Sequence, residues 1–395
     1  MKTKFFLNLG RSAGIVMGAG FALTASAGTQ SFSAGQTLVD GSNVYSLVTG
    51  DFMGNGHKDI ITSDGSVWVG DGAGNFIAGP AVPSANYLAV ADVNHDGLPD
   101  LIETYESNQV AVFLNITQPG DSVPTFAAPV YFNTGNSATV VTTADVNGDG
   151  LPDLIVADTG AYAVDVLLDT TVPGSSNVTF SNFQAFPAGN GANWVAAADL
   201  NGDGKPDLMV LNNMDNTISV YINTTANLDT TASFTAQQVF SVGNFPNMVT
   251  TADINGDGSQ DIVVANNSEN AISVLLNTTP NGSTTASFAA EETFATGQEP
   301  DSVIAVDVNG DGLPDLVAAN AMDGTISVIQ NTTTPGSSTA SFAPQVNYTV
   351  GGDPENLVSD DLNGDGKPDL AVLNVSDPDS GYMSSVSLLF NSPNI

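Results

Sequence analysis

A nine-residue acidic pattern recurs along the chain at a nearly fixed step, and this repeat constrains the fold more than any other feature. The pattern is Asp-x-Asn-x-Asp-Gly-x-x-Asp, and its first full copy runs from Asp92 to Asp100. Five more full copies follow, at a spacing of 53 residues and then four times 54, beginning at Asp145, Asp199, Asp253, Asp307 and Asp361. A weaker copy spans residues 51–59, where Met53 occupies the place of the Asn. A fixed period of this size indicates one supersecondary unit per repeat.

Each repeat has the pattern of four β-strands. In the copy around Asp199, small or apolar runs at 194–198 and 207–211 flank the acidic loop. Residues 217–222 alternate in character, as a half-buried strand does, and residues 234–242 form the fourth predicted strand. Four short strands per repeat predict an all-β fold, a seven-bladed β-propeller with four antiparallel strands in each blade.

The two ends of the chain predict that the ring closes. The chain stops just after the third strand of the last repeat, so this blade lacks a fourth strand of its own. Residues 29–41 resemble a fourth-strand segment, with Phe32 lying 19 residues before Asp51, the spacing that other repeats keep. We therefore expect this segment to complete the last blade, which removes the free edges that an open solenoid, the alternative, would retain. The expected single domain, residues 28–395, divides into blades at about 44–84, 85–137, 138–191, 192–245, 246–299, 300–353 and 354–395 with 29–41.

The first 27 residues predict export. Lys2, Lys4 and Arg11 form a basic start, an apolar run follows at 13–25, and Ala-Ser-Ala at 25–27 fits a cleavage site. The run is short for a transmembrane helix, so a cleaved signal peptide is favoured over the alternative, an N-terminal membrane anchor. We expect a protein that is secreted or displayed at the cell surface.

The charge of the mature chain excludes several classes of partner. After residue 27 the sequence keeps three lysines and no arginine against 42 Asp and Glu, a net charge of −39. Nucleic acids and anionic membranes are therefore poor partners, because phosphate groups are bound by Lys and Arg. The sequence has no cysteine, so disulfides cannot stabilise it, and bound divalent cations are the expected counterweight to its self-repulsion.

The acidic loops carry the ligand types that Ca²⁺ prefers. Side-chain oxygens at positions 1, 3 and 5 and the backbone carbonyl of position 7 can converge on one ion, and the Asp at position 9 can close the sphere. The Gly at position 6 permits the sharp bend. Position 12 lacks the Glu of an EF-hand except at Glu103, so a strand–loop–strand cage is expected, with six calcium sites and a possible seventh in the weaker copy. The alternative is a set of Asp/Asn/Gly turns without metal.

The candidate metal-binding residues are Asp92, Asn94, Asp96, Leu98 and Asp100; Asp145, Asn147, Asp149, Leu151 and Asp153; Asp199, Asn201, Asp203, Lys205 and Asp207; Asp253, Asn255, Asp257, Ser259 and Asp261; Asp307, Asn309, Asp311, Leu313 and Asp315; Asp361, Asn363, Asp365, Lys367 and Asp369; and, in the weaker copy, Asp51, Asn55 and Asp59.

The repeats resemble the FG-GAP/VCBS family, whose best-known member is the propeller head of integrin α chains. The resemblance covers residues 29–395 and rests on the acidic loops and on three copies of the pattern aromatic-x-x-Gly-x-x-Pro, at Phe240, Phe294 and Tyr348. It implies a propeller fold and places the family's calcium ligands on the loop Asp and Asn residues. The family includes adhesion heads, lectins and accessory domains of polysaccharide enzymes, so the resemblance implies a fold and a metal rather than one ligand.

Positions that differ between repeats predict where a ligand binds. They are the junction before the first strand and the turn between the second and third strands, which in a propeller lie on one face, opposite the acidic loops. The candidate ligand-binding residues are Tyr87, Tyr105, Tyr162 and Trp194. Such aromatic side chains stack on sugar rings or anchor protein partners, and the alternative is that they fill the central channel or pack between blades. We expect a monomeric ring that binds a glycan or an extracellular protein.

Two other functions remain open at this stage. A polysaccharide lyase or glycoside hydrolase, or its accessory domain, would need a carboxylate pair away from the acidic loops. The side chains available disfavour catalytic mechanisms that need a histidine, because His57 and His95 are the only histidines and both lie in acidic loops. A purely structural surface protein is the third interpretation.

Overall fold

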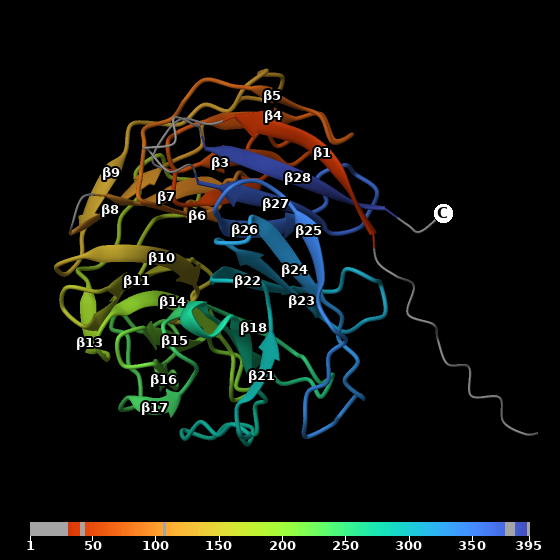
Figure 1. Ribbon diagram of the computed structural model, residues 1–395. Coiled ribbons are helices and arrows are strands. Elements are labelled where there is room, and N and C mark those ends of the chain that lie inside the picture. Colours follow the sequence, from red (N-terminus) through yellow and green to blue (C-terminus); the bar gives the residue numbers. More distant parts are fainter. Residues whose placement is uncertain (1–30, 40–43, 106–107, 376–383, 393–395) are drawn as a thin grey trace, which may run out of the picture.

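The computed structural model describes residues 31–39, 44–105, 108–375 and 384–392, which form seven four-stranded antiparallel sheets (Figure 1). First strands of neighbouring blades contact each other around the whole ring, so they line the axis of the disc. The expected seven-bladed propeller is confirmed. The blades are blade 1 with β2 (Leu47–Gly50), β3 (Asp59–Thr62), β4 (Val67–Gly70) and β5 (Phe76–Ala78); blade 2 with β6 (Tyr87–Ala91), β7 (Asp100–Tyr105), β8 (Gln109–Phe113) and β9 (Val130–Asn133); blade 3 with β10 (Ala138–Ala144), β11 (Asp153–Asp158), β12 (Ala163–Leu167) and β13 (Gln184–Pro187); blade 4 with β14 (Ala192–Ala198), β15 (Asp207–Asn212), β16 (Thr217–Tyr221) and β17 (Gln238–Ser241); blade 5 with β18 (Pro246–Ala252), β19 (Asp261–Asn266), β20 (Ala271–Leu275) and β21 (Glu292–Ala295); blade 6 with β22 (Pro300–Val306), β23 (Asp315–Asn320), β24 (Thr325–Ile329) and β25 (Val346–Thr349); and blade 7 with β26 (Pro354–Asp360), β27 (Asp369–Asn374), β28 (Ser385–Ser392) and β1 (Ser31–Val39).

The N-terminal strand completes blade 7, as the sequence predicts. Strand β1 pairs antiparallel with β28, with Ser31 opposite Ser392 and Val39 opposite Ser385. In Figure 1 the red β1 lies beside the blue β28. Leu38 is buried in a cluster with residues of blades 1 and 7, so this strand contributes to the core as well as to the edge.

The other N-terminal prediction stays untested, because the expected signal peptide, residues 1–27, lies outside the described residues. Within the described part of the chain, no helix has the length and apolar character needed to cross a membrane. The one helix in that part of the chain is a three-residue 3-10 turn, η1 (Asn267–Glu269).

The fourth strand of blade 4 is shorter than the sequence predicts. In blade 4 the prediction is residues 234–242, but β17 covers only Gln238–Ser241. Phe234 forms an isolated bridge with Asn223 instead. The Thr235 hydroxyl accepts the N–H of Ile222 at 3.0 Å beside this bridge. The same bridge and short fourth strand recur in blades 5 and 6, where Ala289 and Ala343 follow the phenylalanine, so the hydroxyl does not cause the shortening.

The core lies between the blades. All residues of β15 and β19 are buried, and the cluster between blades 4 and 5 includes Leu211, Ile218 and Ile262. The phenylalanines that recur every 54 residues belong to a repeated blade-to-blade contact. Four of them pack edge-on against an aromatic side chain of the preceding blade's fourth strand, with ring centroids 4.7–5.0 Å apart, in the pairs Phe132–Phe180, Phe186–Phe234, Phe240–Phe288 and Phe294–Phe342. The fifth, Phe126, packs on Phe52 of the blade 1 loop, with ring centroids 5.9 Å apart.

Glu103 departs from this apolar pattern. It lies on β7 opposite Leu88 and Ala111, is fully buried, and neither of its carboxylate oxygens has a hydrogen-bond partner. Burial raises the pKa of Glu103 from 4.5 to about 8. The same place holds Val or Ala in the other repeats from Asp145 onward, so this acid destabilises blade 2.

We expect Glu103→Val to stabilise the protein, by about 3 kcal/mol at pH 8 and by much less at pH 5. The folded chain binds this proton more tightly than the unfolded chain, so the parent loses stability as pH rises from about 4.5 through about 8, whereas the variant does not. The measurement is the free energy of unfolding of both proteins against pH.

Glu103→Gln serves as the control, since it keeps the shape of the side chain and removes only its titration. A difference between parent and both variants that does not change with pH would contradict this account of Glu103.

Candidate metal loops and the opposite face

All seven acidic loops connect first and second strands, so the antiparallel topology places them on one face of the disc, the acidic-loop face. In blade 4 the loop wraps around its first aspartate. Asp199 accepts the N–H of Asp203 at 3.2 Å on one carboxylate oxygen and that of Gly204 at 2.7 Å on the other. Gly204 has a φ of +85°, which explains why position 6 is glycine. The first aspartates of the other loops, including Asp51, accept the same two N–H groups.

The aspartate at position 9 fixes each loop by accepting two backbone N–H groups. Asp207 is fully buried and accepts the N–H of Leu200 at 2.9 Å and the N–H of Asn223 at 2.7 Å. One carboxylate thereby joins the start of the acidic loop to the end of the third strand. Burial raises the pKa of Asp207 to about 6, and these two N–H groups oppose that rise. The same pair of bonds recurs at Asp100, Asp153, Asp261, Asp315 and Asp369, and at Asp59 with Gly70 as the second donor.

The donor chemistry of the loops fits a hard cation. Every side chain at positions 1, 3, 5 and 9 of the six full copies offers carboxylate or amide oxygens, and the carbonyl of position 7 does not depend on side-chain type. The lysine at position 7 of blade 4 does not occupy its own loop, because the Lys205 ammonium donates to the carbonyl of Thr225. In the weaker copy Met53 is buried and supplies no such oxygen.

The loop side chains bond to their own backbone in the arrangement shown. The Asn201 oxygen accepts the N–H of Asp203, and its amide donates to the Asp203 carboxylate at 3.3 Å. Among the described residues, no group of three or more Asp, Glu or His side chains stands gathered as a metal site. The remaining lone pairs of these oxygens make the loops candidate sites, and their occupancy stays a prediction.

The asparagine at position 3 also hydrogen-bonds to the next blade, a contact that we call a clasp. Asn201 donates from its amide to the carbonyl of Ser283 at 3.0 Å and accepts the N–H of Gly282 at 2.7 Å on its backbone carbonyl. Both partners lie in the turn between the third and fourth strands of blade 5. The same clasp joins the loops at Asn94, Asn147 and Asn255 to the following blade. The loops therefore hold the ring together as well as offering oxygens to a cation.

A second clasp runs in the opposite direction along the ring. Asn223, after the third strand of blade 4, donates to the carbonyl of Val146 in the loop of blade 3 at 2.9 Å. Equivalent bonds start from Asn115, Asn277, Asn331 and Asn391. Blade 3 carries Asp169 at this place, whose Oδ2 atom is buried without a partner, and burial raises the pKa of Asp169 to about 6.

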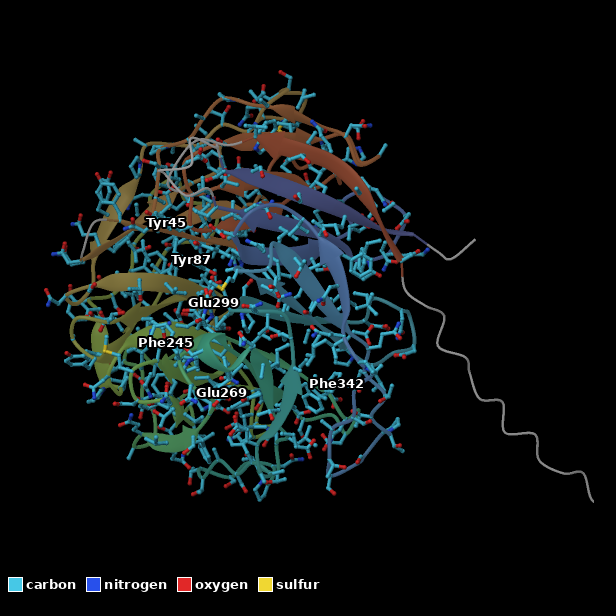
Figure 2. The ribbon with its side chains drawn as sticks, viewed as in Figure 1. Tyr45, Tyr87, Phe245, Glu269, Glu299 and Phe342 are labelled. Atoms are coloured by element: carbon cyan, nitrogen blue, oxygen red, sulfur yellow. The ribbon has the colours of Figure 1, made fainter. Side chains whose placement is uncertain are left out.

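The junctions before the first strands and the turns between second and third strands lie together on the other face, the junction face, as predicted. Backbone bonds link each turn to the preceding junction, for example Asn267 N–H to the carbonyl of Phe245 at 3.1 Å and Ala321 N–H to Glu299 at 2.9 Å. Figure 2 shows Tyr45, Phe245, Glu269 and Glu299 spread across the middle of the disc, with Phe342 nearer its edge.

Two of the four predicted ligand residues lie in the channel. Tyr87 and Trp194 meet edge-to-face with ring centroids 5.1 Å apart, and the Tyr87 hydroxyl hydrogen-bonds Asn356 of blade 7. Burial raises the pKa of the Tyr87 hydroxyl far above its usual range. Both rings line a cavity of about 350 Å³ between the first strands of blades 2 to 5. This is the arrangement of the channel-filling alternative, and the cavity is large enough for a small ligand.

The other two predicted residues lie farther out. Tyr105 is half-buried and packs on Tyr131, with ring centroids 5.0 Å apart. Tyr162 is 50% exposed on the turn of blade 3. The four residues therefore do not form one site.

The sequence analysis missed Phe245 as a ligand candidate. Its side chain is 46% exposed and its φ is +51°, in a junction where the equivalent residue of blade 4 is Gly191 with a φ of +71°. An aromatic residue standing at a place that glycine fills in the neighbouring repeat was the available signal. Met214 and Met322, which are 71% and 64% exposed, occupy the equivalent turn positions of blades 4 and 6.

Two further cavities lie on the acidic-loop face. One of about 540 Å³ is lined by Asp145, Asp199, Lys205 and Asn227 between blades 3 and 4. Another of about 560 Å³ spans blades 5 to 7 and is lined by residues that include Thr250, Ala305, Asp361 and Lys367.

Solved structures with a similar fold include three of low sequence identity. BBS1N, in a complex with ARL6DN, is 11% identical with a TM-score of 0.59, and the match covers 92% of this chain and 98% of that one. An Agrocybe aegerita lectin, described as recognising non-reducing terminal N-acetylglucosamine, is 18% identical with a TM-score of 0.52 over 79% and 81% of the two chains. Virginiamycin B lyase from Staphylococcus aureus, as an inactive variant with quinupristin, is 12% identical with a TM-score of 0.51 over 92% and 100%. At these identities the likeness concerns the fold.

No curated protein matches the chain in sequence. A model of the FG-GAP-like repeat family does match, at residues 92–156, 199–264, 253–318 and 307–372. Each match runs from the acidic loop of one blade to the second strand of the next blade. These matches cover more than half of the chain and begin on the loops described above. The protein therefore belongs to the FG-GAP-like repeat family.

Proposed function

We propose that this propeller is a secreted, calcium-stabilised module that binds a glycan or a protein through its junction face. One observation carries the proposal: exposed side chains that differ from blade to blade gather on this face, whereas the repeated residues build the clasps. The large exposed apolar side chains of the face are Tyr45, Tyr162, Met214, Phe245 and Met322. Exposed apolar groups on one face of a soluble protein are typical of an interaction surface.

The fold is compatible with both classes of ligand. Propellers of similar fold include BBS1N, which was solved in a complex with a protein, and a lectin that recognises a sugar. The predicted signal peptide supports an extracellular site of action, and the absence of cysteine fits a scaffold stabilised by metal rather than by disulfides.

Two carboxylate pairs bear on the enzyme alternative. In blade 3, Asp158 and Asp165 are both fully buried and accept N–H groups from residues 135–137, so a polysaccharide cannot reach them. Asp301 and Glu355 are half-buried at adjacent junctions, and neither lines the three cavities described above. No specific observation favours catalysis.

The calcium part of the proposal is tested by thermal unfolding of the mature chain with calcium and with excess chelator. Ions bound only by the folded state stabilise it, so we expect chelation to lower Tm by roughly 10 °C or more and calcium, but not magnesium, to restore it. Asp203→Ala should weaken this response, whereas Asp229→Ala in the turn of the same blade should not. An identical Tm in calcium and chelator would refute calcium binding by the loops.

The binding part is tested by screening the mature chain, with calcium present, against arrays of glycans and of extracellular proteins. We expect ligands whose binding is lost when Tyr162 and Phe245 are replaced by Ser and Gly. The matched control replaces Val172 and Leu228, which are both 71% exposed but lie in turns of the acidic-loop face, by Ser. Binding that survives the first pair and is lost with the second would contradict the choice of face.

A further inference from the structure

The junction face of blades 4 to 6 carries a continuous rim of turns tied to junctions by side-chain hydrogen bonds. The N–H of Phe245 donates to the Asn216 oxygen at 2.8 Å, and the Asn244 amide donates to the Glu269 carboxylate at 2.5 Å. One blade further on, the N–H of Glu299 donates to the Asn270 oxygen at 2.8 Å. These bonds fix the exposed groups of three blades in one arrangement, so a partner would meet a preformed surface.

Apolar tips and carboxylates alternate along this rim. We name it the blade 4–6 rim and define it by six exposed residues, Met214, Asp215, Phe245, Glu269, Glu299 and Met322. Phe245 holds a left-handed backbone, with a φ of +51°, and its side chain is 46% exposed, so burial of the ring does not offset the strain. Gly191 shows that the repeat tolerates glycine at this place, so the aromatic group is not required by the scaffold.

The rim is negative and contains no compensating cation. After residue 30 the sequence has only three lysines and no arginine, and Lys58, Lys205 and Lys367 all lie in acidic loops, on the opposite face. The charge of the rim residue Glu299 acts on the junction carboxylate of Asp301: burial raises the pKa of Asp301 to about 6, and the charge of Glu299 adds to that rise. A cationic partner would relieve this repulsion, whereas an anionic partner would add to it.

The shape of the rim distinguishes between a sugar and a protein. None of its six residues lines the three cavities described above, and small ligands bind preferentially in concave sites. Two exposed methionines on turns and an exposed phenylalanine on a junction suit a partner surface against which flexible side chains can adapt.

We propose that the blade 4–6 rim docks a basic protein segment in which lysine or arginine alternates with apolar side chains. This inference rests on the proposed function, which places ligand binding on the junction face, and it commits that function to a protein ligand of positive charge. The carboxylates of Asp215, Glu269 and Glu299 pair with the cationic groups, while Met214, Phe245 and Met322 contact the apolar ones.

The test measures the Kd of the mature chain, with calcium present, for a synthetic peptide of alternating lysine and leucine. Phe245→Gly combined with Met214→Ser leaves the net charge unchanged, and we expect at least a tenfold increase in Kd. The matched control, Val239→Ser with Val346→Ser, removes side chains that are 55% and 53% exposed on outer strands, and we expect less than a twofold change. Tm is measured for every variant, so loss of fold is detected separately.

Charge is tested in the same way. Glu269→Gln with Glu299→Gln should raise Kd at least fivefold and reduce its dependence on salt. Asp121→Asn with Asp229→Asn removes two exposed charges outside the rim and should leave Kd within twofold. Equal losses in rim and control variants would show general attraction to an acidic chain and would overturn the inference.

A parallel titration with an N-acetylglucosamine oligomer separates this inference from the proposed function. If the oligomer binds and the Phe245→Gly/Met214→Ser variant loses it while the peptide does not bind, the junction face is a glycan site; the inference fails and the proposed function stands. If neither probe binds the rim but the array screen finds a ligand for the junction face, the inference fails again and only the proposed function survives. If the screen also finds none, both fail.

Discussion

The buried aspartate that ends each acidic loop is the interaction on which the propeller depends. At Asp207 and its six counterparts, one carboxylate accepts an N–H from the start of its own loop and another from a distant part of the same blade. A buried carboxylate is expensive unless it is satisfied, so these bonds fix the path of the chain where the first, second and third strands meet. Burial leaves the pKa of each of these aspartates well above its ordinary value, which shows that they keep a cost that the fold must offset.

The two asparagine clasps extend this brace around the ring. Asn201 of the blade 4 loop donates to Ser283 of blade 5, and Asn277 of blade 5 donates back to the carbonyl of Leu200 in the same loop, so the two clasps join this acidic loop twice to the following blade. Position 3 is at once a candidate calcium ligand and an inter-blade contact. An ion in one loop would therefore act on the contact between blades, and the scaffold function is concentrated on the acidic-loop face. The junction face carries none of these asparagine clasps, so its residues can differ between blades.

Much of the fold follows from the spacing of the repeat. The 54-residue step, the acidic nonapeptide and the spare strand near Phe32 predict the blades, the loop face and the closure, because each depends on a periodic pattern. The extent of the fourth strand does not follow, because the phenylalanine that starts the predicted strand pairs only as an isolated bridge, which strand propensity does not reveal. The direction in which Tyr87 and Trp194 point is also hidden, since a residue at the start of an innermost strand can face the channel or the surface.

Other features of the site required the structure. The sequence assigns position 9 to the metal, but only the structure shows that both oxygens of Asp207 already bond to backbone N–H groups. The repeat spacing shows that Phe245 stands where Gly191 stands in blade 4, but the left-handed backbone that the two residues share and the exposure of the ring come only from the structure. Asp169 stands where the neighbouring repeats carry asparagine, but only the structure shows that this asparagine donates to the preceding blade and that the Asp169 Oδ2 atom is left buried without a partner.

The central claim is that one face builds the ring with calcium while the other is free to bind. Hydrogen–deuterium exchange of the mature chain, with calcium and with chelator, tests it most directly. We predict that calcium slows exchange in the acidic loops and in the third-to-fourth-strand turns that they clasp, such as residues 281–284, and leaves the junctions around Phe245 and Glu299 unchanged. Protection by calcium at the junction face, or none at the loops, would contradict the account.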